Sequence, residues 1–87
     1  MGNLIQEFQI YLEVERNVSS HTQIAYIADV QEFSHFLQSN SFIKKKDEVI
    51  NVEPEAIRAY LGYLYRQKVK KITVNRKVSS LRAFYKY

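Results

Sequence analysis

The side chains best suited to bind another molecule lie near the C-terminal end of the chain. Residues 58–87 contain nine bases and no acid, whereas residues 1–57 contain nine acids and four bases. The formal charge is therefore 4 − 9 = −5 in the first part and +9 in the second, a division that the net charge of +4 conceals. A basic run can be merely a solvated helix face, but this division favours a polyanion as partner.

The elements that position these bases are predicted to be helices, because apolar residues recur at helical spacing nearly throughout. We expect an all-α, four-helix bundle, with helices over about residues 3–16, 21–39, 54–67 and 73–87. Tyr60 and Tyr65 should flank the inward stripe of the third helix. The four inward stripes are predicted to be Leu4, Phe8, Tyr11 and Leu12; Tyr26, Val30, Phe33 and Leu37; Ile57, Leu61 and Leu64; and Val74, Val78, Leu81 and Tyr85.

Local signals mark where three of the helices should begin. Ser20 is predicted to cap the second helix, and Gln23 three residues later would complete a capping box. Pro54 suits the first position of the third helix, where its missing N–H would have no partner. Thr73 is predicted to cap the fourth helix. Residues 40–53 lack a clear period and are interpreted as a surface connection.

The fourth helix would carry a basic outer face once its inward stripe is subtracted. This face comprises Thr73, Arg76, Lys77, Ser80 and Ala83. Small side chains beside long donors suit the major groove of DNA, which admits one α-helix. Arg76 could bind guanine O6 and N7 through two hydrogen bonds, while Lys77 could bind a phosphate or remain solvated.

The N-terminal end of the second helix is another candidate contact. Ser20, His21 and Thr22 gather there, where unpaired N–H groups and the positive end of the helix dipole favour a phosphate. Capping alone would explain Ser20, whereas the fold accounts less well for His21 and Thr22. We therefore expect this end to approach the DNA backbone.

Other kinds of chemistry lack the residues that they need. The chain has no cysteine and two histidines, so we expect no disulfide, metal site or cofactor. Gly2 and Gly62 are the only glycines, which excludes a glycine-rich phosphate loop. The N-terminus lacks the pattern of a signal peptide and the apolar stretches are short, so we expect a cytoplasmic protein without a membrane partner.

Two ordered motifs give the chain a resemblance to a known family. Ser-x-His-Thr-x-x-x-Tyr-x-x-Asp-Val-x-x-Phe-x-x-Phe-Leu runs from Ser19 to Leu37, and Thr-Val-x-Arg-Lys-Val-Ser-x-Leu-Arg-x-Phe-Tyr runs from Thr73 to Tyr85. The chain resembles the N-terminal SAM-like core-binding domain of tyrosine recombinases, the phage integrase family. Within that family it is most similar to Xer site-specific recombinases of the XerC type.

The resemblance implies that residues 1–87 form one DNA-binding domain whose second and fourth helices face double-stranded DNA at a recombination half-site. Such a domain would position the protein for strand exchange, in chromosome dimer resolution or DNA integration. Other protomers would join it in a tetrameric synapse through the first helix, although the isolated domain should be monomeric. The expected DNA contacts are Ser20, His21, Thr22, Ala25, Lys71, Thr73, Arg76, Lys77 and Ser80.

The resemblance also implies that strand cleavage belongs to a separate C-terminal catalytic domain, which this chain lacks. The chain alone is therefore expected to bind DNA and not to be an enzyme. Tyr85 and Tyr87 are not interpreted as nucleophiles, because no phosphate-activating groups gather around them in the sequence.

Two other functions remain open. In a helix-turn-helix regulator the fourth helix would read DNA, although the basic connector before it lacks glycine and looks longer than the usual three or four residues. In a protein-interaction module Tyr11, Phe36 and Phe42 would form an exposed patch. Lys44, Lys45 and Lys46 could touch flanking DNA or face water under any of these readings.

Overall fold

The computed structural model describes residues 2–44 and 52–86. These residues form four α-helices and no strand: α1 (Gly2–Val14), α2 (Ser20–Ser39), α3 (Pro54–Arg66) and α4 (Lys71–Lys86). The all-α prediction is confirmed, and each helix begins and ends within two residues of its expected bounds. Within the described residues, no helix combines the length and the apolar character needed to cross a bilayer.

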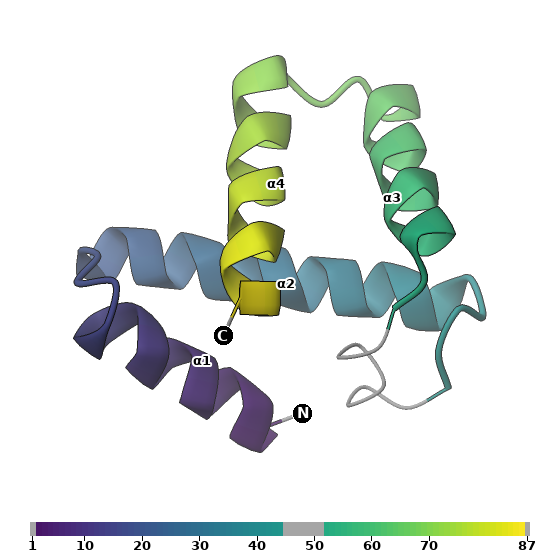
Figure 1. Cartoon of the computed structure of the whole chain (residues 1–87). Coiled ribbons are helices and arrows are strands. Elements are labelled where there is room, and N and C mark those ends of the chain that lie inside the picture. The colour runs from purple at the N-terminus through teal and green to yellow at the C-terminus, as the bar shows by residue number, and fades with distance from the viewer. Residues whose placement is uncertain (1, 45–51, 87) are drawn as a thin grey trace.

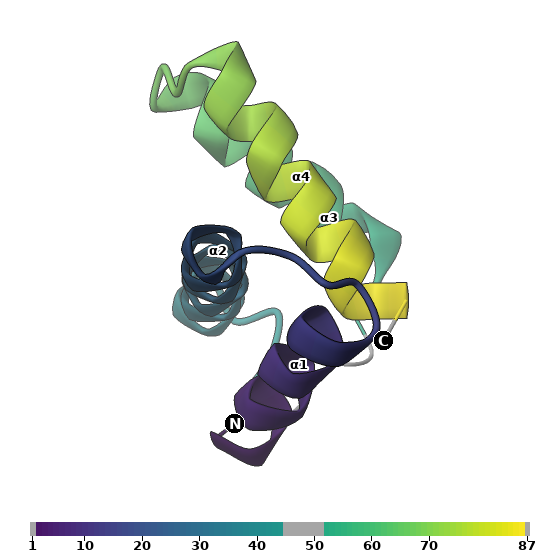
Figure 2. The ribbon, with the colours of Figure 1, turned by 90° about the vertical axis from the view of Figure 1, so that its left-hand side faces the viewer.

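The longest helix, α2, organises the molecule (Figure 1). It contacts each of the other three helices, and its most extensive contact is with α4. Figure 1 shows α3 and α4 running side by side away from α2 and joined at their far ends, with α1 on the other side of α2 in that view. In a view nearly along α2, the C-terminal ends of α1 and α4 lie close together beside it, and from there α4 extends above α2 and α1 below it (Figure 2).

The core forms where α1, α2 and α4 meet and continues along α2 to α3. Phe8 of α1 packs edge-on against Phe84 of α4, with ring centroids 5.3 Å apart. Phe33 of α2 packs against Tyr60 of α3 at 4.9 Å. The buried apolar residues are Phe8, Leu12, Val30, Phe33, Leu37, Ile43, Ala56, Tyr60, Leu64, Leu81, Ala83 and Phe84.

The inward faces of α3 and α4 differ from the predicted ones. Tyr60 was expected at a margin but is buried, whereas Tyr65 is 83% exposed. Val74 and Val78 are only half-buried and Tyr85 is exposed, while Ala83 lies in the core. α4 is therefore rotated relative to the prediction, because a buried acid on α2 draws polar residues of α4 inward, as described below.

The predicted caps of α2 and α4 are also wrong by one to three residues. The N-cap of α2 is Ser19, whose Oγ accepts a hydrogen bond from the backbone N–H of Thr22 at 3.2 Å. Ser20 lies inside the helix, and Gln23 donates to the Val18 carbonyl instead of completing a capping box. These contacts place the start of α2 one residue earlier than predicted.

α3 and α4 begin in different ways. Pro54 opens α3, as predicted. α4 begins at Lys71, and the Lys70 carbonyl accepts a bond from the Val74 N–H at 2.9 Å, so Thr73 lies within the first turn and is not a cap. Thr73 therefore turns with the helix and is half-buried.

Left-handed backbone ends three of the helices without a glycine. Asn17, Ser41 and Lys68 have φ values of 48°, 63° and 59°, and they follow α1, α2 and α3 respectively. Lys44 is exposed. The predictions made for Lys45, Lys46 and Tyr87 fall outside the described residues, and so does the side chain of Leu4.

Candidate nucleic-acid interface

A buried carboxylate lies between α2 and α4. Asp29 of α2 is 1% exposed and accepts hydrogen bonds from three residues of α4. Arg76 donates from Nη2 to Oδ1 at 2.7 Å and from Nε to Oδ2 at 3.0 Å. Lys77 Nζ lies 3.1 Å from Oδ1, and Ser80 Oγ lies 2.6 Å from Oδ2. We call Asp29, Arg76, Lys77 and Ser80 the Asp29 network.

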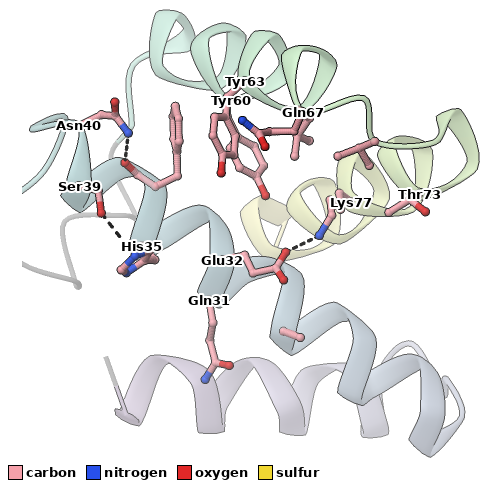
Figure 3. Close-up of a pocket in the computed structure, with 14 residues that line it drawn as sticks. Gln31, Glu32, His35, Ser39, Asn40, Tyr60, Tyr63, Gln67, Thr73 and Lys77 are labelled. Atoms are coloured by element: carbon pink, nitrogen blue, oxygen red, sulfur yellow. Dashed lines mark hydrogen bonds and ion pairs between the residues drawn. The ribbon is translucent and has the colours of Figure 1, made fainter.

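Lys77 is bound on two sides. Its side chain is 9% exposed, and its ammonium also pairs with Glu32, one turn after Asp29 on α2 (Figure 3). Asp29 and Glu32 are three residues apart, and Arg76, Lys77 and Ser80 occupy neighbouring positions of one face of α4, so the two helices present matching stripes. The two acids balance the charges of Arg76 and Lys77.

The pKa values of these groups follow from burial and pairing. Burial alone would raise the pKa of Asp29, but hydrogen bonds from Arg76, Ser80 and Lys77 outweigh it and hold the pKa below its ordinary value of 3.8. The bond to Asp29 raises the pKa of Arg76. Burial opposes the charge of Lys77, yet its bonds to Glu32 and Asp29 raise its pKa overall. All three groups are therefore charged at neutral pH.

Arg76 is anchored on one edge and open on the other. Its guanidinium carries five N–H donors, of which the Asp29 carboxylate takes two, one from Nε and one from Nη2. The side chain is 45% exposed. The edge that carries Nη1 is thus available to an acceptor pair such as a phosphate or guanine O6 and N7.

The structure separates the predicted contacts into exposed and buried groups. On α2, Ser20 and His21 are exposed at the N-terminal end, and Thr22 and Ala25 are half-buried. On α4, Lys71 is exposed and Thr73 is half-buried. The expectation that Lys77, Ser80 and Ala83 lie on an outer face is wrong, because all three are buried.

Two of the predicted contacts share a stripe of α2 with Asp29. Thr22, Ala25 and Asp29 follow one another at spacings of three and four on one stripe of α2, and Asp29 holds Arg76 directly. The stripe that carries Thr22 and Ala25 on α2 therefore continues to the residue that binds Arg76 of α4. The sequence analysis did not predict the role of Asp29 in holding α4. The pattern that could have indicated it is an acid next to Val30 on an otherwise apolar ridge.

Four exposed bases surround the turn between α3 and α4, and we call them the connector cluster: Arg66, Lys68, Lys70 and Lys71. Within residues 2–44 and 52–86, none of them has an ion-pair partner. Unlike Arg76 and Lys77, they therefore leave their charge available to a polyanion.

A cleft of about 950 Å³ opens between α2, α3 and the start of α4. Figure 3 shows Tyr60 and Tyr63 on α3 facing His35 and Glu32 on α2 across it. Burial raises the pKa of Tyr60 to about 12, so its hydroxyl stays protonated at neutral pH. In the part of the chain that the structure describes, no three His, Cys, Asp or Glu residues gather as metal ligands. Aromatic and amide side chains line the cleft, together with His35 and the Glu32–Lys77 ion pair.

Two alternatives from the sequence meet structural objections. Only Phe42 is exposed among the three aromatics proposed as a patch, while Tyr11 and Phe36 pack against the core. The connector between α3 and α4 comprises residues 67–70, so its length is not unusual for a helix-turn-helix, contrary to expectation. However, α3 and α4 run side by side, whereas helix-turn-helix elements cross steeply (Figure 1).

Comparison with known proteins gives a consistent result. Residues 5–87 match the family described as phage integrase, N-terminal SAM-like domain. The chain is 44% identical over its whole length to the tyrosine recombinase XerC of Syntrophus aciditrophicus and covers 29% of that protein. It is 41% identical over 95% of its length to XerC of Lacticaseibacillus casei, of which it covers 27%. It is 38% identical over its whole length to XerC of Staphylococcus aureus strain NCTC 8325, of which it covers 28%.

These matches confirm the resemblance that the two sequence motifs indicated. The chain spans less than a third of the length of these relatives. No solved structure matches it significantly.

Proposed function

The chain belongs to the phage integrase N-terminal SAM-like domain family, and from this membership we propose that it is the DNA-binding domain of a tyrosine site-specific recombinase. It would position a longer protein on a recombination half-site for strand exchange, in chromosome dimer resolution or DNA integration. The observation that carries the proposal is the accessible positive charge around the start of α4, where the exposed Lys70 and Lys71 precede the half-exposed Arg76 by six and five residues.

The accessibility of the proposed contacts supports different roles for them in binding DNA. Lys71 and the N-terminal end of α2, with Ser20, His21 and Thr22, would contact phosphates, since all are accessible at least in part. Arg76 would read a base edge, with Ala25 and Thr73 small enough to permit close approach. The buried Lys77 and Ser80 would support Arg76 from behind.

Other parts of the proposed function concern the longer protein. Cleavage and rejoining would lie outside this chain, and other recombinase protomers would assemble with it in a tetrameric synapse. Such a protein would act on DNA in the cytoplasm. The 87-residue chain itself would bind DNA as a monomer and catalyse nothing.

Fluorescence anisotropy tests the proposal directly. The chain is titrated against a duplex that carries a Xer-type half-site and against a duplex of the same bases in scrambled order, each across a salt series. We expect tighter binding to the half-site and a steep fall in affinity with salt, about −0.9 in the logarithmic slope for each phosphate contacted. Absence of binding to either duplex at low salt would refute the proposed function.

A further inference from the structure

We propose that Asp29 is a positioning residue that holds Arg76 in the orientation needed to read DNA, an inference that rests on the proposed function. The carboxylate does not face DNA itself, since it is 1% exposed between α2 and α4. It acts on the one residue that is both tied to it and open to solvent. That residue is Arg76, whose side chain is 45% exposed.

The geometry fixes the guanidinium plane. Two parallel bonds, from Nη2 at 2.7 Å and from Nε at 3.0 Å, define both the position and the tilt of the group. The carboxylate is itself held by Ser80 at 2.6 Å and by Lys77 at 3.1 Å. The support therefore runs from the interior of the α2–α4 contact to the surface, and the outer edge of Arg76 is presented in one orientation.

Pre-orientation should matter for specificity more than for general affinity. A free arginine loses side-chain freedom when it forms two bonds to a base, whereas an arginine already held loses less. Binding to phosphates in any sequence needs charge and little orientation. Asp29 should consequently increase the preference for the half-site over scrambled DNA. Its negative charge should at the same time weaken binding to either duplex.

Because orientation and charge act in opposite directions, the Asp29→Asn variant should change its affinities for the two duplexes differently. We expect the preference for the half-site to fall at least about fivefold, the lower range for one bidentate base contact. Affinity for scrambled DNA should stay constant or rise, because a negative charge is removed. Simple destabilisation would weaken both complexes alike, and a pure charge effect would strengthen both, so either pattern overturns the inference.

Glu32→Gln is the matched control. It removes the same charge from the neighbouring turn of α2, but Glu32 pairs with Lys77 and makes no bond to Arg76. Its preference for the half-site should equal that of the unaltered chain. A loss as large as that of Asp29→Asn would overturn the inference, because charge and not orientation would then set the preference.

A double-mutant cycle and one spectroscopic readout complete the test. If Asp29 acts through Arg76, adding Asp29→Asn to Arg76→Ala should cost no further preference. The Arg76 Nε–H should exchange slowly with water in the unaltered chain and quickly in Asp29→Asn; equal exchange overturns the inference without reference to DNA. If Asp29→Asn does not fold, Ser80→Ala, which removes the 2.6 Å bond, should show the same pattern in weaker form.

The inference and the proposed function fail in different ways. An unaltered chain that binds neither duplex refutes the proposed function, and the inference falls with it. An unaltered chain that prefers the half-site, with Asp29→Asn retaining that preference, overturns the inference alone.

Discussion

Asp29 lies where a charge is costly, and its neighbours explain why it is tolerated. Removing a carboxylate from water carries a penalty of several kcal/mol unless its acceptor sites are filled. Arg76, Lys77 and Ser80 fill them with four hydrogen bonds. Because Asp29 and Glu32 balance the charges of Arg76 and Lys77, the unpaired positive charge of α4 that the structure describes lies at Lys71 and Arg82.

The acid limb of the stability profile should depend on Asp29. Because its folded-state pKa is lowered, its pairing contributes stability above the ordinary value of 3.8 and loses it as pH falls through the folded value. The free energy of unfolding in urea should therefore fall between pH 7 and pH 3 more in the unaltered chain than in Asp29→Asn. Equal losses in the two proteins would contradict this assignment.

The alkaline limb should depend on Lys77. Its folded-state pKa is raised, so its contribution is complete below 10.5 and is lost as pH rises through the folded value. Between these pH limits the Asp29 network should contribute a constant amount to the free energy of unfolding.

Asp29→Asn should lower the free energy of unfolding by about 3 kcal/mol at pH 7, in line with the loss of one partner from a buried ion pair.

Two lysines six residues apart should differ in their effect on DNA binding. Lys71 is exposed, whereas the Lys77 side chain is 9% exposed between two carboxylates. Lys71→Ala should reduce the logarithmic salt slope of binding by about 0.9, the value for one lost phosphate contact. Lys77→Met, which preserves the buried volume, should leave the slope unchanged. Anisotropy titrations across a salt series measure the slope for both variants. A lower slope for Lys77→Met and an unchanged slope for Lys71→Ala would show that Lys77 leaves the two carboxylates when DNA binds.

At the scale of elements, α4 shows what periodicity can and cannot predict. Each helix end could be placed within two residues, because polar breaks and Pro54 interrupt the apolar spacing. The rotation of α4 could not, since Val78 and Tyr85 mark one candidate face and Ala83 and Phe84 another. The contact that decides between them is Asp29, 47 residues before Arg76 in sequence. A single helix pattern contains no information about such a distant partner.

The candidate site was predictable to the same extent. Residue type and the family resemblance predicted contacts at Arg76 and at the N-terminal end of α2, and the structure leaves side chains accessible at both places. The same reasoning placed Lys77 and Ser80 beside Arg76 on the surface, because both remained on the outer side of the fourth helix once its predicted apolar stripe was subtracted. Burial separates a supporting base from a contacting one, and burial depends on the α2–α4 packing.

The start of α2 offers a matched pair of variants for the element scale. The Ser19 Oγ accepts a hydrogen bond from the Thr22 N–H. Ser20 lies inside the first turn, and its side chain has no hydrogen-bond partner among residues 2–44 and 52–86. Ser19→Ala should lower the free energy of unfolding by about 1 kcal/mol. Ser20→Ala should change it by less than about 0.5 kcal/mol. Urea unfolding measures both, and a larger loss for Ser20→Ala would restore the N-cap predicted from sequence.

At the scale of the whole molecule, the charge division of the sequence becomes a division in space. Residues 1–57, with a formal charge of −5, include α1 and α2, whereas residues 58–87, with +9, include α4 and most of α3. Figure 1 shows α3 and α4 extending together away from α1. A polyanion would therefore attract one side of the molecule more strongly, which would orient it before any specific contact forms.

α2 links the two halves of the core, so the molecule should unfold as one unit. Phe8 joins α1 to α4 through Phe84, and Phe33 joins α2 to α3 through Tyr60. Phe8→Leu removes an edge-on ring pair from the fully buried part of the core and should cost about 1–2 kcal/mol. Phe42→Leu, at a residue that is 44% exposed, should cost well below about 1 kcal/mol.

Native-state hydrogen exchange distinguishes global from local unfolding in these variants. If α2 couples the helices, the most protected amides of α3 should lose as much protection in Phe8→Leu as those of α1, although Phe8 lies in α1 and packs against Phe84 of α4. Retained protection in α3 would show that α3 unfolds separately from α1 and α4. The cleft between α2, α3 and α4 would then be a boundary between two cooperative units, and Arg66 would move with α3 independently of Arg76 on α4.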